Sequence, residues 1–288
     1  MTYTRIRRPA HAGTFYPATK EELVKAIEYS FMHPIGPGKL PIKEGERTDR
    51  RSIGFIVPHA GYIYSGPVAA HAYYKLSLEK PPQTIVLVGP NHNGIGIGAA
   101  VYKGDAWRTP LGDVEVDMET AKLLVEHSSY FGFDSDAHIY EHSLEVQLPF
   151  LQYIYDGEFK IVPITIYVQT PDVARDLASA LAKIIEENKI DMIYIASTDF
   201  NHYEPHEISV QKDLMAINAI LERDEEKLYR LLDEHNITMC GPVAAAGLIR
   251  LSKLLEGSTP RLLKHATSGD ITGEKEWVVG YASIWFPQ

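Results

Sequence analysis

The chain has no hydrophobic run long enough to cross a membrane. Its longest apolar stretches, such as Ile53–Val57 and Thr84–Val88, have the length of a strand, whereas a membrane-spanning helix needs about 20 apolar residues. The basic start, with Arg5, Arg7 and Arg8, is not followed by the apolar stretch of a secretory signal. We therefore expect neither a membrane span nor a secretory signal.

Cysteine and positive charge are both scarce. The single cysteine, Cys240, has no partner for an internal disulfide, which fits a reducing compartment, and we expect a cytoplasmic protein. Lys and Arg total 28 against 38 Asp and Glu, which gives a formal net charge of −10. Because nucleic-acid binding depends on basic patches that contact phosphate, we expect no nucleic-acid partner.

Several motifs of well-known enzyme classes are also missing. The sequence has no GxGxxG after a strand, no Walker loop, no HExxH and no CxxC pair. It lacks the GxSxG elbow of serine hydrolases as well. The glycine-rich stretch at 94–98 does not have the dinucleotide fingerprint. These absences argue against common nucleotide-binding and hydrolytic sites.

Short apolar runs alternate along the chain with helical patterns. We expect the principal strands at Ile53–Val57, Thr84–Val88, Ala99–Tyr102, Lys160–Tyr167, Met192–Ala196 and Trp277–Trp285. Strands that are apolar throughout are typical of a sheet covered on both faces. The sequence therefore predicts a three-layer α/β/α sandwich around a largely parallel or mixed sheet. With no repeat or composition break, one domain is expected over residues 1–288.

Histidine is abundant, with 12 residues, and three histidines follow predicted strands. They are His59, His92 and His202. Ligands of an open α/β sheet bind beyond the carboxyl ends of its strands, and imidazole serves both as metal ligand and as proton shuttle. One such histidine alone would more often be structural. Three in equivalent places predict a shared pocket.

Two further residues near these strand ends carry useful chemistry. Asp199 lies three residues before His202 and could orient its imidazole or bind a metal beside it; the alternative is an Asx turn or a helix cap. Cys240 precedes a predicted helix near Val243, whose N-terminus would stabilise a thiolate. The alternative is a buried cysteine at a tight turn.

The segment 141–149 is also dense in polar side chains. Glu141 and Glu145 share one face of a predicted helix and His142 lies beside them; an ordinary acidic first turn explains the pattern equally well. His11 lies in an aromatic arm that could fold over the pocket. The remaining histidines considered are expected to be surface or structural residues: His127, His138, His206, His235 and His265.

Six ordered motifs give the sequence a family resemblance. They are RPAHAGTFYP at 8–17, VPHAGYIYSG at 57–66, GPNH at 89–92, EHSLEVQLPF at 141–150, STDFNHY at 197–203 and CGP at 240–242. Over essentially the whole chain the sequence resembles the Memo family, named for a mediator of cell motility. Members of that family are similar in fold to class III extradiol non-haem iron dioxygenases.

The resemblance implies a metal pocket lined by His59, His92 and Cys240, with His202 as acid/base and Asp199 close by. The residues that we expect to surround this pocket are His11, Tyr62, Asn91, Glu141, His142, Glu145 and Asn201. Ring-cleaving dioxygenases hold Fe(II) with two histidines and a carboxylate, so a thiolate in third place is a departure. The softer donor shifts preference toward Cu(I), zinc or a differently tuned iron. We expect iron or copper as the cofactor, with zinc as a third candidate.

Three functions follow from this pocket. The first is a metal-binding redox protein, an oxidoreductase whose substrate the sequence does not disclose. The second is a module that binds a small molecule or a peptide without turnover, with Tyr62, Tyr64 and Tyr203 as aromatic walls. The third is hydrolysis by a zinc-activated water, with His142 or Glu145 as base. Homo-oligomer formation is left open.

Overall fold

A mixed β-sheet forms the centre of the protein. The computed structural model describes residues 3–42, 45 and 47–288. Four parallel strands occupy the middle of the sheet: β2 (Ser52–Val57), β9 (Met192–Ser197), β3 (Thr84–Pro90) and β8 (Lys160–Ile166). All but one of their residues are buried, which explains their continuous apolar sequences.

Antiparallel strands extend the parallel centre on both sides. The full order is β10-β12-β2-β9-β3-β8-β4-β7, and β11 also pairs with β12. The flanking strands are β10 (His202–Glu204), β12 (Val278–Pro287), β11 (Arg261–Thr267), β4 (Ala99–Val101) and β7 (Gly132–Phe133). A separate small sheet contains β1 (Ile6–Arg7), β5 (Ala106–Thr109) and β6 (Gly112–Glu115).

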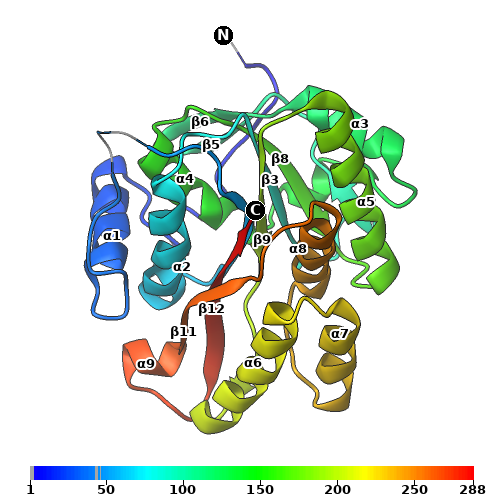
Figure 1. Cartoon of the computed structure of the whole chain (residues 1–288). Helices are drawn as coiled ribbons and strands as arrows, with labels where there is room; N and C mark the ends of the chain where they lie inside the picture. Colours follow the sequence, from blue (N-terminus) through cyan, green and yellow to red (C-terminus); the bar gives the residue numbers. More distant parts are fainter. Residues whose placement is uncertain (1–2, 43–44, 46) are drawn as a thin grey trace.

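Helices cover both faces of the large sheet (Figure 1). One layer consists of α1 (Lys20–Met32), α2 (Tyr62–Ser77) and α4 (Leu148–Tyr155). The other consists of α3 (Met118–His127), α5 (Pro171–Asn188), α6 (His206–Leu221), α7 (Glu225–Glu234) and α8 (Pro242–Leu254). Short elements are η1 (Asp136–His138), η2 (Glu145–Gln147) and α9 (Ser268–Thr272). The predicted three-layer α/β/α sandwich is confirmed.

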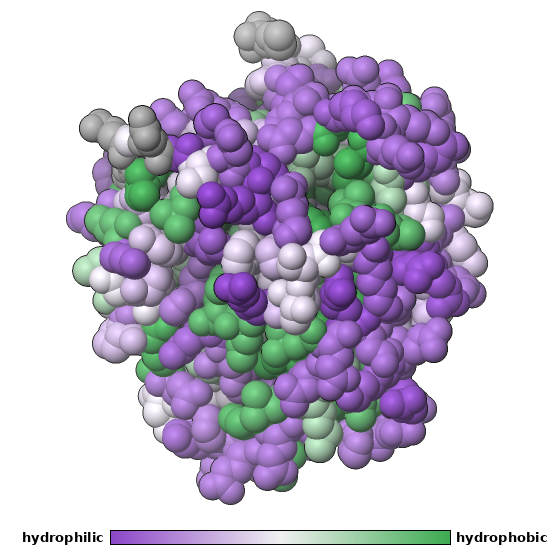
Figure 2. Space-filling view, in the orientation of Figure 1, coloured by the Kyte–Doolittle hydropathy of each residue, from purple (hydrophilic) through white to green (hydrophobic). Residues whose placement is uncertain are grey.

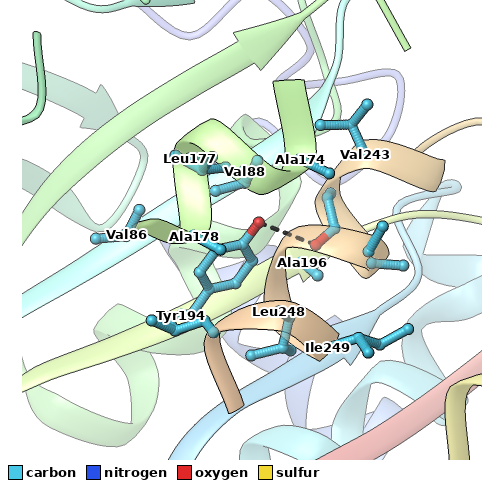
Figure 3. Packing of buried hydrophobic residues seen from close by; sticks show 14 of the residues in the cluster. Val86, Val88, Ala174, Leu177, Ala178, Tyr194, Ala196, Val243, Leu248 and Ile249 are labelled. Atoms are coloured by element: carbon cyan, nitrogen blue, oxygen red, sulfur yellow. Dashed lines mark hydrogen bonds between the residues drawn. The ribbon is translucent and has the colours of Figure 1, made fainter. Parts of the chain in front are cut away.

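Each helical layer packs a hydrophobic core against the sheet. In the α5/α8 layer, Tyr194 of β9 is fully buried, and its phenol donates a 2.9 Å hydrogen bond to the carbonyl of Ala244 (Figure 3). Its ring lies close to Leu177 and Leu248 from the two helices. In the other layer, Tyr73 stacks on Phe150 at a centroid distance of 4.9 Å. Burial of this kind stabilises the fold by about 25 cal/mol per Å² of apolar surface.

The outer surface is mainly hydrophilic on the face seen in Figure 2, with apolar side chains in smaller patches. The longest helix, α5, has 18 residues and combines a buried apolar side with an exposed charged one. Among the described residues no helix is both long and apolar enough to cross a membrane.

The structure departs from the sequence predictions in several elements. The helix predicted to carry Glu141 and Glu145 on one face does not form: Glu141 lies in a loop, Glu145 begins η2, and α4 starts only at Leu148, with Pro149 in its first turn. Of the two roles expected for His138, surface or structural, the structure shows the structural one: the residue is fully buried on η1, against the rings of Tyr102 and Trp107 at 5.5 and 5.8 Å. The short strands β5, β6, β7 and β10 were not predicted, because they have too few residues to show a clear alternation of apolar and polar side chains.

Candidate metal centre

Three histidines converge beyond the carboxyl ends of the central strands. His59 follows β2, His92 follows β3, and His142 lies in the loop before η2. Each offers a ring nitrogen within 4.8 Å of the other two. The ring centroids are 5.3 Å apart for His59 with His92 and with His142, and 4.5 Å apart for His92 with His142. His59 is buried, whereas the His92 side chain is 33% exposed, so the group opens to solvent at His92.

The hydrogen bonds around His59 fix its tautomer. The hydroxyl of Ser197 donates to the carbonyl of Ser143 at 2.7 Å and accepts from Nε2 of Gln147 at 2.8 Å. Because its proton is already used, Ser197 Oγ accepts from Nδ1 of His59, which lies 2.9 Å away. The unprotonated Nε2 of His59 therefore points into the site.

Glu141 fixes the tautomer of His92. Its carboxylate accepts from the backbone N–H of His92 at 2.6 Å and lies 2.8 Å from Nδ1 of the same residue. Burial opposes ionisation of Glu141, but the hydrogen bond and charge of His92, with His142 nearby, lower its pKa to about 2. The ionised carboxylate accepts the Nδ1 proton and leaves Nε2 of His92 as a free donor atom.

The imidazoles of His142 and His59 are both held neutral by burial. Burial, followed by the proximity of His59, lowers the pKa of His142 to about 3. Burial and the neighbouring His92 lower the pKa of His59 well below its usual value. Neutral imidazole is the form that binds a metal, so burial prepares both rings for coordination.

Cys240 meets the histidine group from the turn before α8. Its Sγ lies 3.3 Å from Nε2 of His59 and accepts the backbone N–H of Asp199 at 3.2 Å. The expectation of a thiolate stabilised by a helix N-terminus is wrong for this pocket. Burial, and then the carboxylate of Asp199, raise the pKa of the Cys240 thiol. The thiol therefore keeps its proton and can donate it to His59.

Asp199 is bound to His59 rather than to His202. Its Oδ1 accepts the backbone N–H of His59 at 2.8 Å, and its Oδ2 lies 4.0 Å from His59 Nε2. Burial raises the pKa of Asp199. The residue that orients His202 is Thr238, whose hydroxyl accepts the His202 backbone N–H at 2.8 Å and whose carbonyl lies 2.7 Å from Nδ1. The expected orientation of His202 by Asp199 is thereby corrected.

The predicted surrounding residues have separate roles. The amide of Asn201 accepts from the backbone and hydroxyl of Thr238, both at 3.2 Å, and so supports His202 indirectly. Asn91 accepts the backbone N–H groups of the loop that follows His92. The buried phenol of Tyr62 donates to the carbonyl of Val146, so Tyr62 is a core residue and not an exposed aromatic wall.

The N-terminal arm does reach the site, as suggested for His11. The ring of His11 lies 5.6 Å from that of His142, and Phe15 lies 4.4 Å from it. Glu145 is fully buried, and each of its two oxygens accepts two hydrogen bonds from the arm. With its acceptor positions occupied in this way, Glu145 is unsuited to the role of hydrolytic base considered above.

Several contributors were missed from the sequence. Ser197, Gln147, Thr238 and Phe15 carry no distinctive chemistry of their own, although the first is the last residue of β9 and follows the strand-end rule. The others act through hydrogen bonds or packing between distant segments, which a single sequence does not disclose.

Comparisons with known proteins identify the family of the chain and support its fold. Residues 7–285 match the family described as Memo-like protein. The chain belongs to the Memo-like family. Its relatives include a MEMO1 family protein of Aeropyrum pernix, 52% identical over 97% of this chain and 99% of the relative. Another MEMO1 family protein, from Sulfurisphaera tokodaii, is 48% identical over 98% of this chain and 99% of the relative.

A solved structure supports the fold of this Memo-like chain. An uncharacterised protein from Escherichia coli K12, JW3007, superposes with a TM-score of 0.54 at 16% identity. The match covers 82% of this chain and 99% of the bacterial one. At this identity the likeness concerns the shared α/β architecture.

Proposed function

We propose that this protein binds a transition-metal ion and uses it in redox chemistry. The observation that carries the proposal is the group of His59, His92 and His142, whose ring nitrogens lie within 4.8 Å of one another. Two of these rings have Nδ1 engaged by a partner, Ser197 or Glu141, which leaves Nε2 for a metal. Cys240 adds sulfur beside His59.

The donor set fits the ions expected from the sequence. Imidazole nitrogen suits iron, copper and zinc, and a thiolate shifts preference toward Cu(I) and zinc. His59, His92 and Cys240 are the proposed ligands, with His142 as an additional nitrogen donor at the same place. A bound iron or copper ion would supply electron transfer or oxygen activation.

The protein's own groups would manage the protons. The Cys240 thiol must lose its proton to bind metal. Asp199, whose backbone N–H contacts Sγ and whose carboxylate lies 4.0 Å from His59 Nε2, is the proposed acceptor, because His59 needs the lone pair of Nε2 for the metal. His202 is the proposed acid/base, because the carbonyl of Thr238 accepts its Nδ1 proton and leaves Nε2 able to take up another. Asp199 is the second proposed catalytic residue, through its contact with Cys240 and His59. Since the only thiol belongs to the site, we place the protein in a reducing compartment such as the cytoplasm.

Anaerobic reconstitution with Fe(II), Cu(I) or Zn(II), followed by elemental analysis, and by electron paramagnetic resonance after oxidation of the bound copper to Cu(II), tests the proposal. H59A and H92A should bind far less metal than wild type, and C240S should bind less and change the copper spectrum. H127A, which alters a partly exposed histidine of α3, is the matched control. Equal metal content in wild type and H59A would overturn the ligand assignment.

A non-catalytic binding module remains the second candidate because of exposed aromatic side chains near the site. Tyr203 is 67% exposed, and its ring lies 5.8 Å from that of His202; Tyr64 is 41% exposed and lies in the first turn of α2, shortly after His59. Such surfaces suit a small molecule or a peptide. This candidate predicts that a peptide or small-molecule library raises the melting temperature of the metal-free protein, and that Y203A abolishes the effect. No stabilisation by any member would reject it.

A further inference from the structure

The N-terminal arm is joined to the metal centre by one buried arginine. The side chain of Arg7 is 3% exposed. Its guanidinium donates to the carbonyls of His138, Ile139 and Glu141 at 2.7, 3.3 and 2.8 Å, and to the carboxylate of Glu145 at 2.6 Å. It also lies over the ring of Trp107, 4.2 Å from the centroid. Arg7 therefore holds the backbone immediately before His142.

Glu145 completes the connection from the opposite side. One carboxylate oxygen accepts from Arg7 and from the backbone N–H of Ala10 at 2.9 Å. The other accepts from the backbone N–H of His11 at 2.8 Å and from the phenol of Tyr16 at 2.6 Å. Burial opposes the charge, but Arg7 and Tyr16 lower the pKa of Glu145, so the pair is ionised.

The buried pair is weak evidence for added stability. Removing two charges from water costs several kcal/mol per ion, and well-packed apolar residues often replace such pairs without loss. The arrangement of its hydrogen bonds indicates what it does instead. Arg7 fixes the segment that carries Glu141 and His142, while Glu145 fixes the arm that carries His11 and Phe15, which contact the His142 ring.

We infer that Arg7, paired with Glu145, is a positioning residue of the metal centre. The carbonyl of Glu141 is held by Arg7, and the carboxylate of the same residue fixes the Nδ1 proton of His92. His142 follows directly and is confined between this segment and the arm. Arg7 thus sets the relative placement of two metal-binding imidazoles without touching either. The inference rests on the proposed metal-binding function.

The conservative variant R7K separates positioning from folding. Lysine keeps the charge for Glu145 but, as a point charge, cannot reproduce the planar fork that reaches the three carbonyls. We expect R7K to fold, to melt within a few degrees of wild type, and to bind Co(II) about 10- to 100-fold more weakly, as for other losses of support around metal ligands. Its Co(II) absorption bands should shift in intensity, because the coordination geometry changes.

E145Q is the second variant and R108K is the matched control. E145Q keeps the shape of the pair and tests the same connection if R7K does not fold. Arg108 makes a two-point ion pair with Asp113 on the exposed β5–β6 hairpin, so R108K should bind Co(II) as wild type does. Wild-type Co(II) affinity and spectra in folded R7K and E145Q would overturn the inference.

Imidazole ¹⁵N chemical shifts of the metal-free protein distinguish this inference from the proposed function. If wild type binds no metal, the proposed function fails, yet positioning is still measured through the tautomers of His92 and His142. R7K and E145Q should mix the tautomers of these two rings and leave His71, which is bound to the carbonyl of Ile35 in another part of the fold, unchanged. Unchanged shifts at His92 and His142 would overturn positioning.

Discussion

The carboxylate of Glu141 contacts His92 at two points: it accepts the backbone N–H at 2.6 Å and lies 2.8 Å from Nδ1 of the ring. One acidic side chain thereby sets both the path of the loop after β3 and the tautomer of an imidazole at its end. We therefore expect metal binding to depend on Glu141 as well as on the donor atoms.

The variant E141Q should bind metal about 10- to 100-fold more weakly than wild type, because a neutral amide no longer stabilises the Nδ1 proton of His92. A competition titration with a chromophoric chelator measures the affinity. E115Q is the control, since Glu115 at the end of β6 forms a partly exposed ion pair with Lys160 at the start of β8. Equal affinities for E141Q and E115Q would contradict this prediction.

Stability of the metal-free protein should fall as the pH drops below 6.5, partly because of His142. Its pKa is about 3 in the folded protein against an ordinary value of 6.5, so between these values the unfolded chain binds the extra proton. A depressed pKa stabilises the fold above 6.5, and that contribution is lost on acidification, with a slope of up to about 1.4 kcal/mol per pH unit. Urea unfolding at several pH values should give a shallower slope for H142N than for wild type.

Cys240 should be slow to react in the metal-free protein. Its thiol pKa is raised by burial and by the Asp199 carboxylate, and the thiolate is the reactive form. We expect alkylation by iodoacetamide at pH 8 to be at least about tenfold slower than in urea, as followed by intact mass. D199N, which removes the neighbouring negative charge, should react faster. Native alkylation as fast as in urea would show that the thiol is already ionised or open to solvent.

Replacing Tyr194 by Phe should destabilise the core without affecting the metal centre. The variant loses the hydrogen bond to Ala244 at 2.9 Å, at a cost of about 0.5–1.5 kcal/mol in the free energy of unfolding. Chemical denaturation measures this difference, and Y130F, at an exposed tyrosine, is the control. A loss of metal affinity in Y194F would contradict the separation of this core from the site.

The central sheet and part of the site could be predicted from sequence because both depend on local pattern. Continuous apolar strands indicated a doubly covered sheet, and the rule that ligands bind beyond strand ends placed His59 and His92 together. His142, left open between a site residue and a helix turn, joins them through a loop whose path is set by Arg7 and Glu141.

Predictions that required side-chain partners across the chain were less successful. Proximity in sequence suggested Asp199 as the partner of His202, but the free backbone N–H of His59 binds that carboxylate, and Thr238 takes its place. His138 was expected to be either a surface or a structural residue, and its burial depends on contacts with Arg7, Tyr102 and Trp107 from other parts of the chain. Contacts over more than 100 residues leave no local signal.

Cys240 and His59, whose Sγ and Nε2 atoms lie 3.3 Å apart, are separated by 181 positions in the chain. Between them in sequence lie β3, β8 and β9, while β12, still later, pairs directly with β2. During synthesis the histidines therefore emerge from the ribosome well before the thiol does. A nascent chain cannot assemble the proposed donor set until Cys240 has been made, so we expect any metal to bind only after most of the chain has been synthesised.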